Sequence, residues 1–156
     1  MKSLFFAVSA ALTLGSLAFV FSSGFTPPAA SGNIIFRVSG MDNSKGVVRV
    51  VLYGDEKKFL SENGFAAADS AFAHANGVVE VTLHNVPFGT YAAAFYQDEN
   101  QNGVIDQNMF RIPTEPYAFS NGVRAKWNVP DFKMVAFRFG QSDTRLEATL
   151  HDWSEQ

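Results

Sequence analysis

The chain has 156 residues, a formal net charge of −3 at pH 7 and no cysteine. A fold held by disulfides is therefore excluded, and the lack of a basic stripe argues against nucleic acid as a partner. Once an N-terminal leader is set aside, the remaining length fits one domain, which is large enough to bury a core without covalent staples.

Residues 1–31 have the pattern of a secretory signal peptide and a short linker. Lys2 gives a positive start, 4–21 is an apolar run, and small or helix-breaking residues follow up to Ser31. This order predicts cleavage and export, so we expect a periplasmic or secreted protein with no stable membrane insertion. An uncleaved anchor stays open as the alternative, because the run is about as long as the ~20 residues that a span needs.

Residues 32–156 form the expected domain, in which apolar and polar residues alternate repeatedly. Alternation of period two is typical of strands that bury one face. It predicts strands near 34–39, 47–53, 79–84, 91–97, 132–139 and 144–151, whereas 55–72 has the composition of a short helix or turn. With about seven strands and little helix, we expect an all-β fold, an antiparallel β-sandwich of immunoglobulin-like or transthyretin-like type.

The segment that follows the strand near 91–97 has the spacing of the front of a calcium-binding loop. Oxygen-bearing side chains stand at its first, third, fifth and ninth positions, and Gly103 stands at the sixth: Asp98, Asn100, Asn102 and Asp106. Calcium prefers such hard oxygen ligands, and the carbonyl oxygen of the seventh residue, Val104, is a further candidate. Calcium is therefore the candidate cofactor.

The calcium loop lacks one ligand, and two other interpretations of the segment stay open. Met109 stands at the twelfth position, where such a loop closes with a carboxylate, so binding should be weak unless Glu115 supplies the missing ligand. A plain Asn-Gly turn with solvated acids stays open. So does neutralisation of the acids by the basic residues that follow, Arg111, Arg124, Lys126 and Lys133.

The connection between Gln97 and Asp131 has no clear strand but is rich in aromatic residues and proline. Structureless connections longer than about 12–15 residues are uncommon, and they are usually functional or disordered. We therefore expect a ligand-binding face formed by Tyr117, Phe119 and Trp127. The alternative is that these rings plug one end of the sandwich core.

Two stretches resemble the bacterial DUF2141 family, whose members carry an acidic Asn/Gly loop followed by a Pro–Glu–aromatic–Phe-Ser-Asn stretch. The first stretch is 96–121, with the acidic loop, then Glu115-Pro116-Tyr117 and Phe119-Ser120-Asn121, and the second is the turn 86–91. The resemblance extends over about 34–150. It implies an exported domain and leaves its activity open.

No catalytic residue is identified. The chain lacks cysteine and a Gly-x-Ser-x-Gly elbow, and His74, His84 and His151 are far apart in the sequence. We expect a non-catalytic binding or interaction module of the bacterial cell envelope, with an unknown envelope or extracellular ligand. A purely structural domain without a small ligand is one alternative. A metal-assisted hydrolase that uses loop carboxylates, such as Glu115 with Asp131, is the other.

Overall fold

The computed structural model describes residues 30–41, 44–74, 76–125 and 128–155. The expected signal peptide and the expected ligand-binding residue Trp127 lie outside the described residues. In the described part of the chain, no helix is long and apolar enough to cross a membrane.

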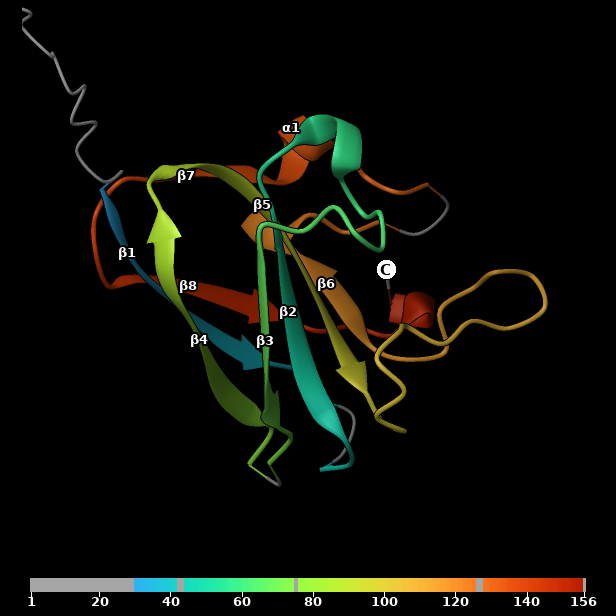
Figure 1. Cartoon of the computed structure of the whole chain (residues 1–156). Helices are drawn as coiled ribbons and strands as arrows, with labels where there is room; N and C mark the ends of the chain where they lie inside the picture. Colours follow the sequence, from blue (N-terminus) through green and yellow to red (C-terminus); the bar gives the residue numbers. More distant parts are fainter. Residues whose placement is uncertain (1–29, 42–43, 75, 126–127, 156) are drawn as a thin grey trace, which may run out of the picture.

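The described residues form eight strands in two sheets that face each other (Figure 1). The three-stranded sheet has the order β4-β1-β8, with β4 at Val78–Pro87, β1 at Ser31–Ser39 and β8 at Thr144–Thr149. The five-stranded sheet has the order β3-β2-β5-β6, with β3 at Ala67–Phe72, β2 at Val47–Tyr53, β5 at Gly89–Asp98 and β6 at Tyr117–Phe119. Strand β7, at Ala136–Phe139, pairs with the first half of β5.

The structure confirms the all-β sandwich. Every strand pair within the described sheets is antiparallel except β1 with β8, which run parallel. The space between the sheets is filled by the apolar residues of the predicted alternation. Phe36 is fully buried among them, with the centre of its ring 5.1 Å from that of Phe95. The residues that alternate with this core point to the outer faces.

The five-stranded sheet also has an apolar outer face, which is covered by the loops around it. Ala92, Tyr117 and Phe119 form a second cluster with Val135 on that face. Two short helical segments cover the cluster, the 3-10 turn η1 at Glu56–Lys58 and the helix α1 at Phe132–Val135. They lie together at one end of the sandwich (Figure 1), and the rings of Phe59 and Phe132 are 5.8 Å apart. This outer cluster therefore accounts for Tyr117 and Phe119 of the long connection.

Three local expectations were wrong. Residues 67–72 form edge strand β3 instead of a helix, because pairing with β2 outweighs the helical preference of an alanine-rich segment. Residues 132–135 form a helical turn before β7, closed by the hydrogen bond from Met134 N to Asp131 O of 3.0 Å. The connection expected to lack a strand contains β6.

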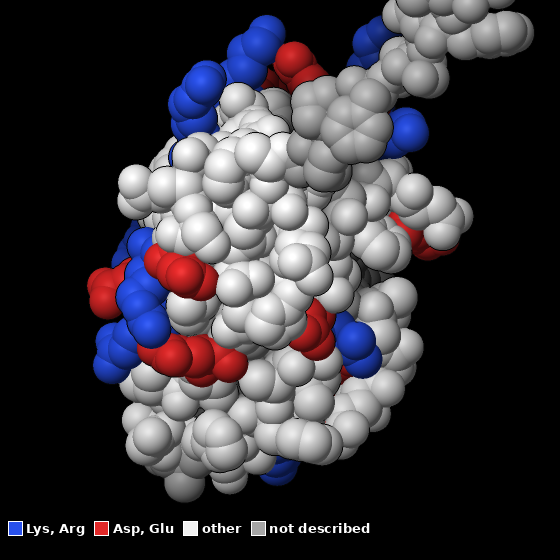
Figure 2. Space-filling view, turned by 60° about the vertical axis from the view of Figure 1, so that its left-hand side comes forward, with Lys and Arg blue, Asp and Glu red and all other residues white. Residues whose placement is uncertain are grey.

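The outer face of the three-stranded sheet is polar. Ion pairs link the strands there. Arg37 of β1 pairs with Glu147 of β8 at 3.9 Å, and Arg145 of β8 reaches across β1 to Glu80 of β4 at 3.2 Å. On the side of the molecule seen in Figure 2, acidic and basic side chains are intermingled and form no continuous patch of one sign. Such exposed pairs stabilise a fold only slightly.

Candidate functional site

The candidate site is the long loop between β5 and β6. The chain leaves the sheet at Asp98 and returns at Tyr117. Residues 98–106 are the acidic loop. Residues 106–114 form an arm whose two sides are joined by hydrogen bonds from Asn108 N to Ile112 O and from Thr114 N to Asp106 O, both of 2.9 Å. The arm projects from the side of the sandwich (Figure 1, orange-yellow loop at the right).

Asp98 anchors the start of the acidic loop, and its side chain is 0% exposed. Arg49 Nε on β2 donates a hydrogen bond of 2.6 Å to Asp98 Oδ2, and the backbone N–H groups of Asn102 and Gly103 donate to Oδ1 and Oδ2 at 3.0 and 2.9 Å. Burial raises the pKa of this carboxyl, but these hydrogen bonds and the charge of Arg49 outweigh the burial and leave the pKa below its ordinary value. The ionised carboxylate therefore closes the turn.

Glu115 joins the two ends of the acidic loop, at Glu99 and Asp106. Its side chain is 5% exposed, and its Oε1 accepts from Glu99 N while its Oε2 accepts from Asp106 N, both at 2.9 Å. Burial raises the pKa of Glu115 above its ordinary value; the two backbone hydrogen bonds offset this only in part, and nearby Asp106 and Asp98 raise it further. The structure thus brings Glu115 to the acidic loop, with both oxygens directed to backbone N–H groups.

Asp106 gathers the two asparagine side chains of the loop. Asn100 Nδ2 donates to Asp106 Oδ2 at 2.6 Å, and Asn102 Nδ2 donates to Asp106 Oδ1 at 2.9 Å. The N–H of Val104 donates to Asn102 Oδ1 at 2.9 Å, and the Val104 side chain is exposed. The residues expected to bind calcium therefore lie within one turn and are connected to one another.

The asparagine amides present nitrogen, and not oxygen, to Asp106. A cation in this turn requires both amides to turn over, so that their oxygens face it. In the described part of the chain, no group of three or more His, Cys, Asp or Glu side chains is placed to hold a metal. A calcium ion here would depend on amide and backbone oxygens in addition to Asp98 and Asp106.

The basic residue that pairs with buried Asp98 is not one of those expected from the sequence. Lys133 pairs with Glu56 at 3.4 Å, Arg124 lies 3.1 Å from Nε2 of His151, and Lys126 is outside the described residues. Arg49 neutralises Asp98 instead. The alternation in β2 was the sequence signal that places Arg49 on the outer face. Its pairing with Tyr96, two residues from Asp98, is known only from the structure.

The expected ligand-binding rings do not form an open face. Tyr117 is 7% and Phe119 is 9% exposed, so the expectation that they stand on an exposed platform was wrong. Tyr117 and Phe119 pair with residues of β5 that face outward, so both rings enter the outer cluster. The Tyr117 hydroxyl donates a hydrogen bond of 2.5 Å to Ala125 O. The sequence could not indicate that η1 and α1 would cover this face.

Ser120 is a buried polar residue whose role the sequence did not reveal. Its Oγ accepts from Ala93 N at 2.9 Å and lies 2.5 Å from Val135 O, to which it donates. Asn121 Nδ2 donates to Ala136 O at 2.9 Å. The Phe-Ser-Asn stretch therefore ties β6 to β5, α1 and β7, which is a structural role.

The family described as "Uncharacterized protein conserved in bacteria (DUF2141)" matches residues 36–147. The match includes the acidic loop, the arm, Glu115 and the Phe-Ser-Asn stretch. Comparison with curated proteins and with solved structures gives no match. Because the matched segment covers most of the chain, the protein belongs to the bacterial DUF2141 family.

Proposed function

We propose that this protein is an exported, non-catalytic interaction module of the bacterial cell envelope. In this proposal the acidic loop is a rigid support, and the arm is the part that meets an envelope or extracellular partner. One contrast supports it. Asp98 and Glu115 are buried and hold the backbone of the loop, whereas Met109 and Phe110 at the end of the arm are 88% and 76% exposed.

Exposed apolar side chains on a fixed loop are typical of a binding element. A loop that is ordered before binding loses less conformational entropy when the complex forms, so more of its contact energy appears as affinity. A large exposed aromatic side chain also provides much of the apolar area that stabilises interfaces. Both features are present at the end of the arm.

The carboxylates of the loop are poorly suited to catalysis. A general acid or base must reach a substrate, but both oxygens of Glu115 already accept hydrogen bonds from backbone N–H groups. Within the described residues, no hydrogen bond joins Glu115 to Asp131, the pair on which a hydrolase would depend, and Glu115 does not line the pocket at Asp131. These contacts favour the non-catalytic proposal over the hydrolase.

A purely structural domain is the second candidate. Tyr117, Ser120 and Asn121, which belong to the stretch that resembles the family motif, all brace the fold. If the whole chain has only a structural role, the arm binds no partner. The structural and the interaction proposals therefore differ in whether Phe110 contacts a partner.

Site-specific photo-crosslinking in the producing cell tests the proposed function. A photoreactive residue replaces Phe110, and a matched control replaces Phe72, which is 68% exposed on edge strand β3. We expect a discrete adduct from position 110 and none from position 72. Equal background labelling at both positions would favour the structural domain.

We also propose that calcium occupies the acidic loop and stabilises the arm. The grouping of Asp98, Asn100, Asn102 and Asp106 in one turn supports this. Arg49 already neutralises Asp98, so the ion should be held only weakly, in the ~10⁻⁴–10⁻³ M range of extracellular calcium modules.

Export is proposed on the order of charged, apolar and small residues in 1–31. Protein recovered from the cell envelope or the medium should begin between Phe25 and Gly32. An intact Met1 terminus in the membrane fraction would show that the leader is an uncleaved membrane anchor.

A further inference from the structure

The end of the arm is an apolar and cationic tip formed by Met109, Phe110 and Arg111. Asn108 Oδ1 accepts from the N–H groups of Phe110 and Ile112 at 2.9 and 3.2 Å, which fixes the turn beneath the tip. Arg111 has a φ of 60°, a left-handed conformation that directs the chain back into the arm. The exposed Arg111 side chain makes no hydrogen bond or ion pair with a described residue. The tip therefore offers two apolar groups and one unpaired cation to a partner.

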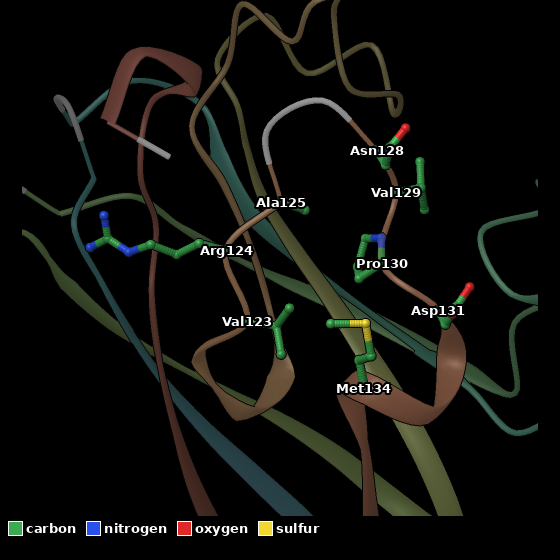
Figure 3. Close-up of a pocket in the computed structure, with 8 residues that line it drawn as sticks. All are labelled: Val123, Arg124, Ala125, Asn128, Val129, Pro130, Asp131 and Met134. Atoms are coloured by element: carbon green, nitrogen blue, oxygen red, sulfur yellow. The ribbon is translucent and has the colours of Figure 1, made fainter.

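A pocket with an acidic residue at its edge lies in the segment between β6 and β7 (Figure 3). It has a volume of ≈ 330 Å³, and its apolar lining includes Val123, Val129, Pro130 and Met134. Figure 3 shows Met134 extended toward Val123, Asp131 at the edge, and Arg124 turned away toward another part of the molecule. Val129 and Met134 are 66% and 57% exposed, so this apolar surface is open to solvent.

Asp131 is the acidic residue of the pocket. It precedes α1, yet its side chain makes no capping hydrogen bond, and it forms no ion pair with a described residue. Arg124 does not neutralise it, because the Arg124 guanidinium lies 3.1 Å from Nε2 of His151. The pocket thus combines a partly apolar lining with a carboxylate that has no partner among the described residues.

We propose that the chain binds a second copy of itself by this tip and this pocket. Phe110 of one copy enters the pocket, Met109 covers Val129, and Arg111 pairs with Asp131. A volume of ≈ 330 Å³ accommodates one phenyl ring. Because each copy has both a tip and a pocket, the contact can be made twice in a two-fold dimer, which is the commonest symmetry of oligomers. Within one copy the tip stays exposed, so the pocket is not already filled by it.

The match between the tip and the pocket favours a second copy over a lipid surface. Glu99 and Asp106 lie at the base of the arm, and their negative charge repels anionic headgroups beside the single cation of the tip, Arg111. The pocket instead offers an apolar surface for Phe110 next to the exposed carboxylate of Asp131. The contact is small, so we expect a weak, concentration-dependent dimer.

Sedimentation equilibrium of the exported protein, from about 10 µM to about 1 mM, tests the proposal, because small interfaces associate in this range or not at all. Wild type should dimerise, and Phe110→Ser, Arg111→Glu and Asp131→Arg should each weaken the dimer by about tenfold or more. The chain with both Arg111→Glu and Asp131→Arg should recover to within about threefold of wild type, since the pair is restored with reversed charges.

Arg138→Glu is the matched control, because Arg138 is exposed on β7, outside the tip and the pocket, and its change in charge is the same. It should leave the dimer unchanged. A thermal melt of each variant checks that it is folded. The proposal is overturned by a wild type that stays monomeric at the highest concentration, or by a dimer that is insensitive to Phe110→Ser. It is also overturned by a double variant that stays as weak as the single ones, or by a monomer whose Phe110 binds anionic vesicles.

This inference rests on the proposed function, because it names the partner of the arm. The two can fail separately. An adduct of twice the chain mass from position 110 supports both, and an adduct of another mass retains the interaction module but overturns self-association. Absence of any adduct at position 110 overturns the proposed function as well.

Discussion

Arg49 on β2 donates a hydrogen bond of 2.6 Å from Nε to Oδ2 of Asp98, the first residue of the acidic loop. The pair joins the five-stranded sheet to the loop, and only Arg49 is in contact with solvent, with 31% of its side chain exposed against 0% for Asp98. A buried carboxylate without its partner is costly, so Arg49 and Asp98 depend on each other.

The first prediction concerns Asp98→Asn, which removes the charge but keeps the shape. Breaking a buried pair of this kind costs about 3 kcal/mol, so the free energy of unfolding at pH 7 should fall by roughly that amount. Because the pKa of Asp98 lies below its ordinary value of 3.8, its contribution is present above that value and is lost as the pH falls through the lower folded-state pKa. Urea unfolding from pH 7 to pH 2 should therefore show a decline in wild type below pH 4 that is shallower in the variant.

Asp69→Asn is the control for that series. Asp69 is exposed on β3, and among the described residues it accepts a hydrogen bond only from the neighbouring Ser70 N, at 2.7 Å. Its variant should unfold within ~0.5 kcal/mol of wild type. A loss as large as that of Asp98→Asn would show that the buried ion pair is not the cause.

The second prediction concerns Glu115→Gln. The glutamine keeps the shape of Glu115 but has one acceptor oxygen in place of two and cannot ionise, so it stands for the neutral form of the carboxyl group at every pH. The pKa of Glu115 is raised above its ordinary value of 4.5, so its favourable contribution is full below 4.5 and is lost as the pH rises through the folded-state pKa. Wild type should show this decline above pH 4.5 in urea unfolding, and the variant should lack it. A variant with the same decline would assign it to another group.

The third prediction separates buried from exposed aromatic residues. Tyr117→Ala removes a buried ring and its hydrogen bond to Ala125 O, and should cost ~3–5 kcal/mol of unfolding free energy. Phe110→Ala removes a ring that is 76% exposed, and should cost less than ~0.5 kcal/mol. Denaturant unfolding of the two variants gives the comparison. Equal costs would contradict the assignment of Tyr117 to the outer cluster and of Phe110 to the tip.

The fourth prediction concerns calcium. At about 1 mM calcium the ion would exceed its dissociation constant by ~1–10-fold, which stabilises the fold by ~0.4–1.4 kcal/mol and raises the melting temperature by about 2–6 °C. Thermal melts in EDTA and in calcium, with magnesium as the control ion, measure this shift. Asn100→Asp should enlarge the shift, because a carboxylate replaces an amide beside Asp106. Identical wild-type melts in EDTA and in several millimolar calcium would exclude the calcium site.

Local pattern was sufficient for the fold class. The alternation of Ile34, Phe36 and Val38 and of Val48, Val50 and Leu52 is the alternation of the core, because a strand that buries one face must follow period two. The sequence did not predict β3, since Ala67–Phe72 is an edge strand with mostly exposed side chains and lacks that pattern. It did not predict α1 either, because four residues are too few for a helical period.

The sequence predicted the position of the candidate site but not the contacts that hold it. The spacing of Asp98, Asn100, Asn102 and Asp106 predicted a turn in which these side chains meet, and they do meet. Arg49 could not be named as the partner of Asp98, because the register of β2 against β5 is a tertiary property. The burial of Tyr117 and Phe119 depends likewise on η1 and α1, which come from other parts of the chain.

Amide hydrogen exchange measures the central claim, that Asp98 and Glu115 hold the acidic loop in one shape. The relevant amides are those of Asn102 and Gly103, bound to Asp98, and those of Glu99 and Asp106, bound to Glu115. In wild type, all four should exchange about 100-fold or more slowly than in an unstructured peptide. In Asp98→Asn, protection should fall at Asn102 and Gly103 while Glu99 and Asp106 keep most of theirs. Exchange of these amides in wild type at the rate of an unstructured peptide would contradict the account.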